Sequence, residues 1–145
     1  MLIVTHTMAR APKESIDTLS DMTTVFSKAL RLDSSRFSLQ VFCIPNLLRD
    51  YNRKGAVTVT GNKELTMLLD AKLLRDYEAL ATTTAHEMVH VKQYAKGQLI
   101  TKPRKNGKSP LNYWLGKLNK KDYYNRPWEL EAFSKQQILA NLVAN

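Results

Sequence analysis

Apolar side chains recur at steps of three and four residues along residues 13–32 of the chain. This spacing places them on one face of an α-helix, with polar residues on the opposite face. We therefore expect an amphipathic helix over this segment, with its apolar stripe turned toward a core. The stripe consists of Ile16, Leu19, Met22, Val25, Phe26, Ala29 and Leu30.

Short segments rich in β-branched and aromatic residues predict strands. Residues 2–5 and 37–44 are of this kind. Residues 56–60 and 65–69 form a further pair, and the Gly-Asn dipeptide between them is a turn signal. We expect the second pair to form a β-hairpin.

Two more helices are expected in the second half of the chain. Residues 73–95 contain no Gly or Pro and are rich in Leu, Ala and Glu, and Gly97 is well placed to end a helix. Residues 98–125 have no clear period and are expected to be irregular, with a short helical turn at 113–118. A last helix is expected from about Pro127 to residue 143, because Pro is tolerated in a first turn. This order of elements predicts an α+β fold.

The length of 145 residues fits one ordinary domain, expected to span residues 1–145, and no repeat or long linker divides it. Hydrophobic residues make up 43% of the chain and charged residues 24%, which is enough apolar material for a packed core. No apolar run approaches the roughly 20 residues that cross a bilayer, and the apolar start is too short for a signal-peptide core. A single Cys43 cannot form an internal disulfide, which fits a reducing compartment. We expect a cytoplasmic protein with no membrane partner.

The chain is strongly basic, with 22 Lys and Arg against 13 Asp and Glu and a net charge of +9. Much of the excess lies in residues 102–121, and it favours contact with anionic surfaces such as nucleic acid. No recognised nucleic-acid-binding motif accompanies it. The sequence therefore favours a solvated basic loop over a nucleic-acid contact at this segment.

The motif His86-Glu87-Met88-Val89-His90 falls within the predicted helix of residues 73–95. Two histidines four residues apart project from nearly the same helix face, so both imidazoles can bind one Zn²⁺ ion. Glu87 lies beside them and can accept a proton from water that the zinc activates. This is the division of labour that peptide hydrolysis requires.

A catalytic zinc site usually has a third protein ligand. No His or Cys follows His90, so the third ligand is expected to be a carboxylate or to come from upstream. The downstream candidates are Asp122, Glu129 and Glu131. Glu129 and Glu131 are two residues apart on a predicted helix, so both cannot face the same ion.

The motif at residues 86–90, together with Pro127-Trp128-Glu129-Leu130-Glu131-Ala132, resembles the gluzincin branch of zinc metallopeptidases. It looks in particular like small phage- and prophage-type metallopeptidases. The resemblance implies a compact zincin-like domain with a small mixed sheet, in the host cytoplasm if phage-encoded. It also implies that the third zinc ligand is Glu131, which stands before a small residue as in that family, and that Glu129 has a supporting role.

The same resemblance has implications for the substrate, a peptide or protein. In such enzymes a sheet edge strand leads into the active helix and pairs with extended substrate, and residues 57–69 would correspond to it. A tyrosine often stabilises the oxyanion, and Tyr124 or the neighbouring Tyr123 stands in a suitable place.

Three alternatives remain open at this level. A Spartan-like protease acting on DNA-associated proteins would suit the basic charge but is expected to have a third His downstream. A deformylase-like zinc hydrolase would need Cys43 as a ligand, although Cys43 lies in an apolar, strand-like segment. A catalytically silent, metal-stabilised binding module would have no need of Glu87.

Overall fold

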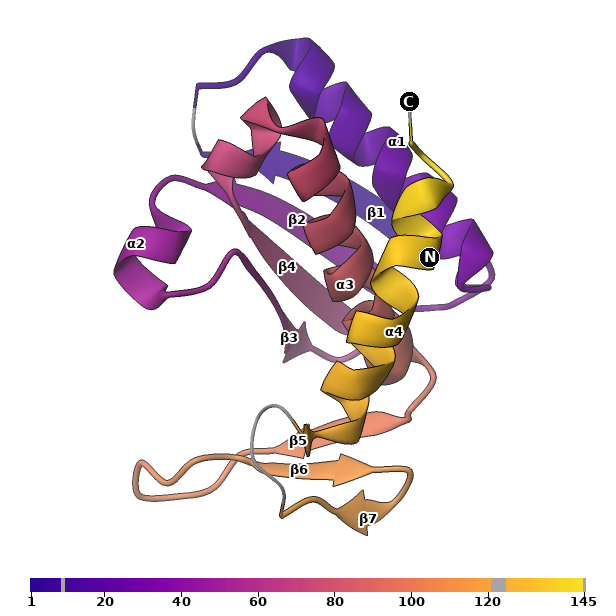
Figure 1. Ribbon diagram of the computed structural model, residues 1–145. Coiled ribbons are helices and arrows are strands. Elements are labelled where there is room, and N and C mark those ends of the chain that lie inside the picture. Colours follow the sequence, from indigo (N-terminus) through magenta and orange to yellow (C-terminus); the bar gives the residue numbers. More distant parts are fainter. Residues whose placement is uncertain (9, 121–124, 145) are drawn as a thin grey trace.

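The computed structural model describes residues 1–8, 10–120 and 125–144 (Figure 1). Helices pack with a small mixed sheet, and a separate antiparallel sheet follows in the chain, which confirms the α+β class. The elements are β1 (Leu2–Thr7), α1 (Lys13–Ala29), β2 (Ser38–Ile44), α2 (Leu47–Tyr51), β3 (Gly55–Gly61), β4 (Glu64–Asp70), the 3-10 helix η1 (Ala71–Arg75), α3 (Tyr77–Ala95), β5 (Leu99–Lys102), β6 (Leu111–Trp114), β7 (Lys117–Leu118) and α4 (Pro127–Asn141).

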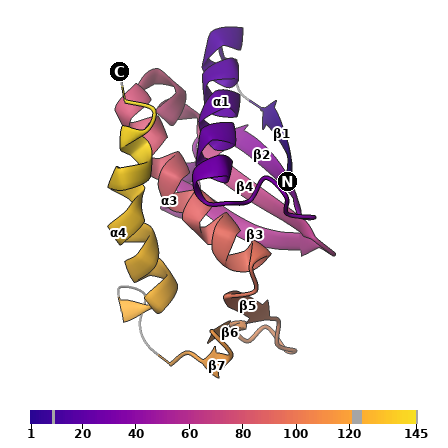
Figure 2. The same cartoon turned by 90° about the vertical axis from the view of Figure 1, so that its right-hand side faces the viewer.

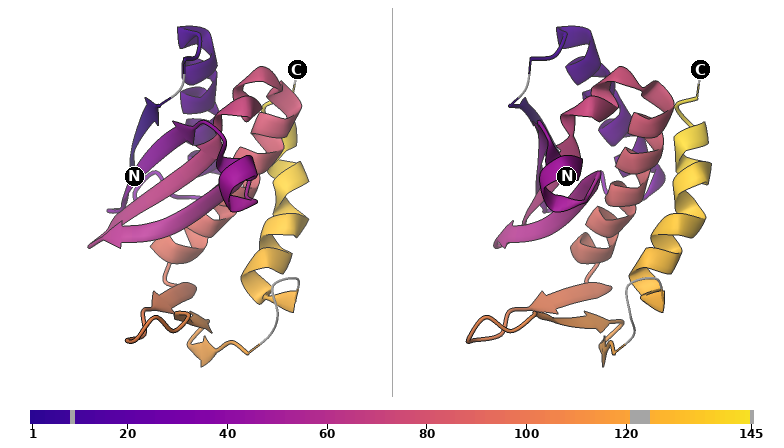
Figure 3. Two further views of the ribbon diagram at one scale, coloured as in Figure 1. Left: turned by 90° about the vertical axis from the view of Figure 1, so that its left-hand side faces the viewer. Right: turned by 60° about the vertical axis from the view of Figure 1, so that its left-hand side comes forward.

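The main sheet has four strands in the order β1-β2-β4-β3. Strands β1, β2 and β4 run parallel, while β3 pairs antiparallel with β4 and lies at one edge of the sheet. The predicted hairpin is thereby confirmed as β3–β4. Helices α1 and α3 cover one face of this sheet, and α4 lies on the outer side of α3 (Figures 2 and 3).

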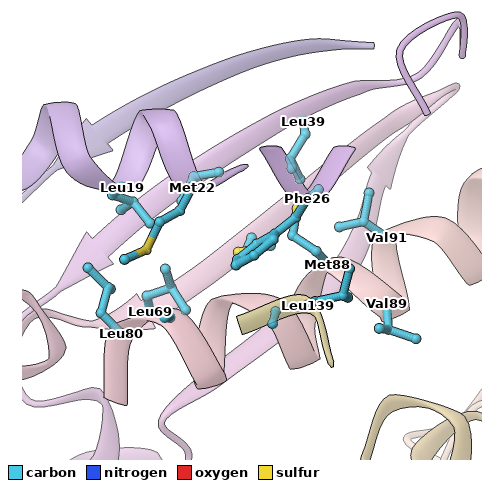
Figure 4. Close-up of a cluster of buried hydrophobic side chains, with 14 of the residues drawn as sticks. Leu19, Met22, Phe26, Leu39, Leu69, Leu80, Met88, Val89, Val91 and Leu139 are labelled. Carbon is cyan, nitrogen blue, oxygen red and sulfur yellow. The ribbon is translucent and has the colours of Figure 1, made fainter. Parts of the chain in front are cut away.

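The core lies between the sheet and its helices (Figure 4). Side chains alternate along β2 and β4, so every second residue of each strand is buried under the helices. From the predicted stripe of α1, Leu19, Met22, Phe26 and Leu30 are buried, whereas Val25 and Ala29 are exposed. Thr23 and Ser27 are buried in their place, so the buried face is rotated slightly from the predicted one. Helix α3 is buried on most of its circumference because the sheet, α1 and α4 surround it. Among the described residues, no helix is both long and apolar enough to cross a membrane.

Helix α3, which contains the motif of residues 86–90, begins at Tyr77 and therefore later than the sequence predicts. Asp70 accepts a hydrogen bond from the Lys72 amide and starts the short helix η1, and Asp76 then caps α3 by accepting from the Ala79 amide. These side chains compete for backbone donors and so divide the predicted helix. Its end is as expected, because Gly97 adopts a positive φ of 70° and the chain closes a two-bond C-terminal cap.

The expectation of an irregular segment with a helical turn at 113–118 was wrong. Strands β5, β6 and β7 form a second, three-stranded antiparallel sheet below the main body in Figure 1. The turn between β5 and β6 contains Asn106 and Gly107, both at positive φ, as in a tight hairpin. This Asn-Gly dipeptide is the sequence signal that could have identified the hairpin.

Candidate metal centre

Two helices bring three ligand-type side chains together. Helix α3 presents His86 and His90 one turn apart, and α4 presents Glu129 from its first turn. The Oε1 atom of Glu129 lies 3.0 Å from Nε2 of His86 and 2.8 Å from Nε2 of His90. One ligand atom from each side chain lies within 4.8 Å of the others, so the three residues could hold a metal ion.

The third residue of this cluster is Glu129, whereas the resemblance favoured Glu131. Glu131 turns away from the histidines: its carboxylate accepts from Nζ of Lys92 at 2.8 Å and from Nζ of Lys135 at 3.1 Å. Burial raises the pKa of Glu131, but the hydrogen bonds from Lys92, Gln93 and Lys135 outweigh it and hold the pKa at about 2. The geometry therefore places Glu129, and not Glu131, beside the two histidines, while the Glu131 carboxylate links α4 to Lys92 and Gln93 of α3.

The rotation of α4 about its axis explains this reversal. Trp128, Ala132 and Leu139 are buried and form the stripe that faces α3. At about 100° per residue, Glu129 and Glu131 flank this stripe on opposite sides. Only the Glu129 side adjoins the two histidines.

Two glutamines orient the histidine rings. The Oε1 atom of Gln136 lies 2.8 Å from Nδ1 of His86, and the Oε1 atom of Gln93 lies 2.8 Å from Nδ1 of His90. Gln93 is itself held, because its Nε2 donates to the carbonyl of Trp128 at 2.9 Å and to Glu131 at 3.0 Å. Each Nδ1–H therefore donates to an amide oxygen, which directs Nε2 toward Glu129.

This arrangement suits a cation. In a neutral imidazole whose Nδ1 donates, Nε2 carries a lone pair. At His90 that lone pair would face a carboxylate oxygen only 2.8 Å away. Two acceptors at this distance repel each other unless a proton or a metal ion lies between them. Two imidazoles and one carboxylate also match the ligand types of catalytic zinc sites.

The charges within the cluster are strongly coupled. Burial would raise the pKa of Glu129, yet the hydrogen bonds from His86 and His90 hold it far below its usual range. Burial lowers the pKa of His90, but the hydrogen bond to Glu129 and the charge of Glu87 outweigh it, so the pKa is raised. The cluster thus favours an anionic carboxylate facing positive charge.

Glu87 lies beside the cluster and has only 6% of its surface exposed. Burial raises the pKa of Glu87, the charges of His90 and His86 oppose this rise, and the charge of Glu129 adds to it. A carboxylate with a raised pKa is a stronger base than an ordinary surface glutamate. Glu87 is therefore a buried carboxyl group beside the two histidines, with its pKa raised.

A groove runs past Glu87 along the edge strand β3. Two adjoining pockets share Arg53, Gly55, His86 and Glu87. One of these pockets extends to His90, Glu129 and residues of the small sheet. The first residues of β3, Gly55, Ala56 and Val57, thus border the metal centre. Of residues 57–69, which the resemblance associated with substrate, only Val57 lines this pocket.

Gly55 allows β3 to approach Glu87 closely. A Cβ atom at this position would lie 2.9 Å from Cγ and 3.2 Å from Oε1 of Glu87. Because Glu87 is buried, it cannot swing away freely. The sequence reasoning missed this residue, as it missed Arg53, Gln93 and Gln136.

Replacing Gly55 with Ala is expected to displace Glu87. If the cluster is a catalytic metal site, hydrolysis should fall by about 10- to 100-fold with metal content unchanged. Steady-state hydrolysis and metal content per chain would measure the two effects. Gly61→Ala is the matched control in the same strand, because its Cβ would meet the carboxylate end of exposed Glu64. Equal activity of Gly55→Ala and the wild type would contradict the close approach inferred here.

Other residues singled out in the sequence are not part of the cluster. Cys43 is buried in β2, and burial raises the pKa of its thiol to about 11. It is absent from the ligand group found among the described residues, so the geometry does not favour a deformylase-like ligand set. Tyr124, Tyr123 and Asp122 lie outside the described residues. Tyr94 does line the pocket, 3.4 Å from the Thr101 hydroxyl.

Comparison of the chain with protein-family models, curated proteins and solved structures finds no match. The chemistry of the site is therefore argued from its own geometry.

Proposed function

We propose that the protein is a zinc-dependent metallopeptidase of gluzincin type. The observation that supports this proposal is the convergence of His86, His90 and Glu129, with Glu87 buried beside them. Two histidines and one carboxylate are the three protein ligands found in many catalytic zinc sites, and they would hold the ion here. We also propose that the protein is related to small phage-type metallopeptidases, forms a single domain and is cytoplasmic.

Each residue has a role in the proposed hydrolysis. His86, His90 and Glu129 would hold the zinc, which supplies Lewis acidity to activate water and to polarise the substrate carbonyl. Glu87 accepts the proton of the attacking water and later delivers it to the leaving amine. Gln136 and Gln93 keep the two Nε2 atoms directed at the ion.

An extended peptide is the proposed substrate. Strand β3 is an edge strand whose Gly55, Ala56 and Val57 line the same pocket as the metal centre. An edge strand can pair with a peptide through main-chain hydrogen bonds, which gives broad side-chain selectivity. We propose that substrate lies along β3, with its scissile bond beside Glu87.

The purified chain is expected to contain about one zinc per molecule and to hydrolyse an unfolded protein such as casein. Incubation with 1,10-phenanthroline should remove the metal and abolish hydrolysis, and added zinc should restore both. The isomer 1,7-phenanthroline, which does not chelate, is the control. Hydrolysis that persists in the metal-free chain would overturn the proposal.

A further inference from the structure

The positive charge of the chain is concentrated in one structural unit. We call residues 99–120, which comprise β5, β6, β7 and their connections, the basic arm. This arm has six cations and no carboxylate, so it contributes +6 of the net charge of +9. All six cations are exposed, and none of them pairs with a carboxylate in the described part of the chain. They are Lys102, Arg104, Lys105, Lys108, Lys117 and Lys120.

The arm is anchored at its base and projects from the body of the molecule (Figures 1 and 3). Leu99 is buried, and the ring of Trp114 lies 6.4 Å from that of Trp128 at the start of α4. The connection between β5 and β6 is exposed over its whole length. Four of the six cations fall within residues 102–108. The arm therefore holds a dense positive charge on a supported hairpin.

The arm also forms one wall of the metal-centre pocket. Thr101, Pro110 and Asn112 line this pocket together with His90 and Glu129. The Thr101 hydroxyl donates to Oδ1 of Asn112 at 2.8 Å, which joins β5 to β6 at this wall. A partner held by the arm would thus lie next to the candidate active site.

We infer that the basic arm binds the phosphate backbone of nucleic acid. Six like charges that have no carboxylate partner among the described residues repel one another, and a polyanion relieves this repulsion. Five of the six cations are lysines, which act as point charges and suit phosphates along a backbone without sequence readout. The four cations of residues 102–108 have no Leu, Ile, Phe or Trp between them to insert into a lipid surface. The exposed Ile100, Leu115 and Leu118 of the arm lie outside this connection, so lipid vesicles are included in the test. The inference does not require the proposed peptidase activity.

The test uses the full-length Glu87→Gln chain, so that any proteolysis is absent. Fluorescence anisotropy with a labelled 20-nucleotide DNA, as single strand and as duplex, is measured from 50 to 200 mM KCl. Four backbone contacts predict that the affinity falls by about 100-fold over this range. The variant K102Q/R104Q/K105Q/K108Q is expected to bind at least 10-fold more weakly, with a much smaller dependence on salt.

A matched control removes the same charge from another part of the surface. Arg10, Lys72 and Arg75 line a pocket beside the start of α1, and Lys13 is exposed nearby. Replacing these four residues with Gln should leave DNA binding within about twofold of the parent. Circular dichroism checks that both variants fold. If the fourfold variant does not fold, the double variant K105Q/K108Q tests the same contact, with a smaller expected loss of DNA affinity.

Three results would overturn the inference. Unchanged DNA binding by the arm variant would exclude the arm as the contact. An equal loss in the control variant would assign binding to overall charge. Tighter binding to polyglutamate or to phosphatidylserine vesicles than to DNA would identify a different partner. Peptidase activity is measured separately in the wild-type chain, so failure of either proposal is recognised by itself.

Discussion

Replacing Glu87 with Gln is expected to lower hydrolysis of unfolded protein by about 10²- to 10⁴-fold, while zinc content and fold remain those of the wild type. Gln has nearly the same size and can occupy the same buried position next to Gly55. It cannot accept a proton from water, so only the chemical step is lost. Casein hydrolysis, zinc per chain and thermal unfolding measure the three quantities.

The control for this substitution is Glu78→Gln, at an exposed position in the first turn of the same helix. It removes the same charge from α3 and should leave hydrolysis within about twofold of the wild type. Loss of zinc together with activity in Glu87→Gln would show that Glu87 is needed for the site itself. Full activity would exclude Glu87 as the base.

The second large effect separates Glu129 from Glu131. Replacing a residue that only hydrogen-bonds to a metal ligand typically lowers metal affinity by about 10- to 100-fold. Glu129→Gln is expected to lower zinc affinity by more than this, because it removes a proposed direct ligand. Glu131→Gln should retain one zinc per chain, since its carboxylate contacts Lys92 and Lys135. Competition with a chromogenic zinc chelator measures both affinities.

Glu131→Gln should instead destabilise the fold by about 1–3 kcal/mol, because Lys92 has only 7% of its surface exposed and loses its charged partner. Thermal unfolding would show this as a decrease of several degrees in Tm. The two variants share one helix and one type of substitution, so each is the control for the other. Zinc loss in Glu131→Gln with zinc retained in Glu129→Gln would restore the assignment that the resemblance favoured.

The sequence predicted the fold correctly where a residue pattern was compatible with only one type of secondary structure. The existence of α1 and of the hairpin β3–β4 was predicted correctly because helical and strand periods differ clearly there. The stripe of α1 was predicted only in part, because Val25 and Ala29 are exposed. The second sheet was missed because its strands have only four, four and two residues, too few to establish a period. The unbroken helix over residues 73–95 was also incorrect, because Asp76 has an extended backbone and its side chain caps a new helix by accepting from the Ala79 amide.

The sequence by itself determined that His86, Glu87 and His90 would share one region of a helix, because a spacing of four residues is one helical turn. It did not determine which carboxylate joins them. Helix α4 has apolar residues on more than one side, including Phe133 and Ile138, which are 47% and 68% exposed, so its sequence leaves the rotation open. Packing of Trp128 and Ala132 against α3 selected the rotation, and only that tertiary contact brought Glu129, rather than Glu131, to the two histidines.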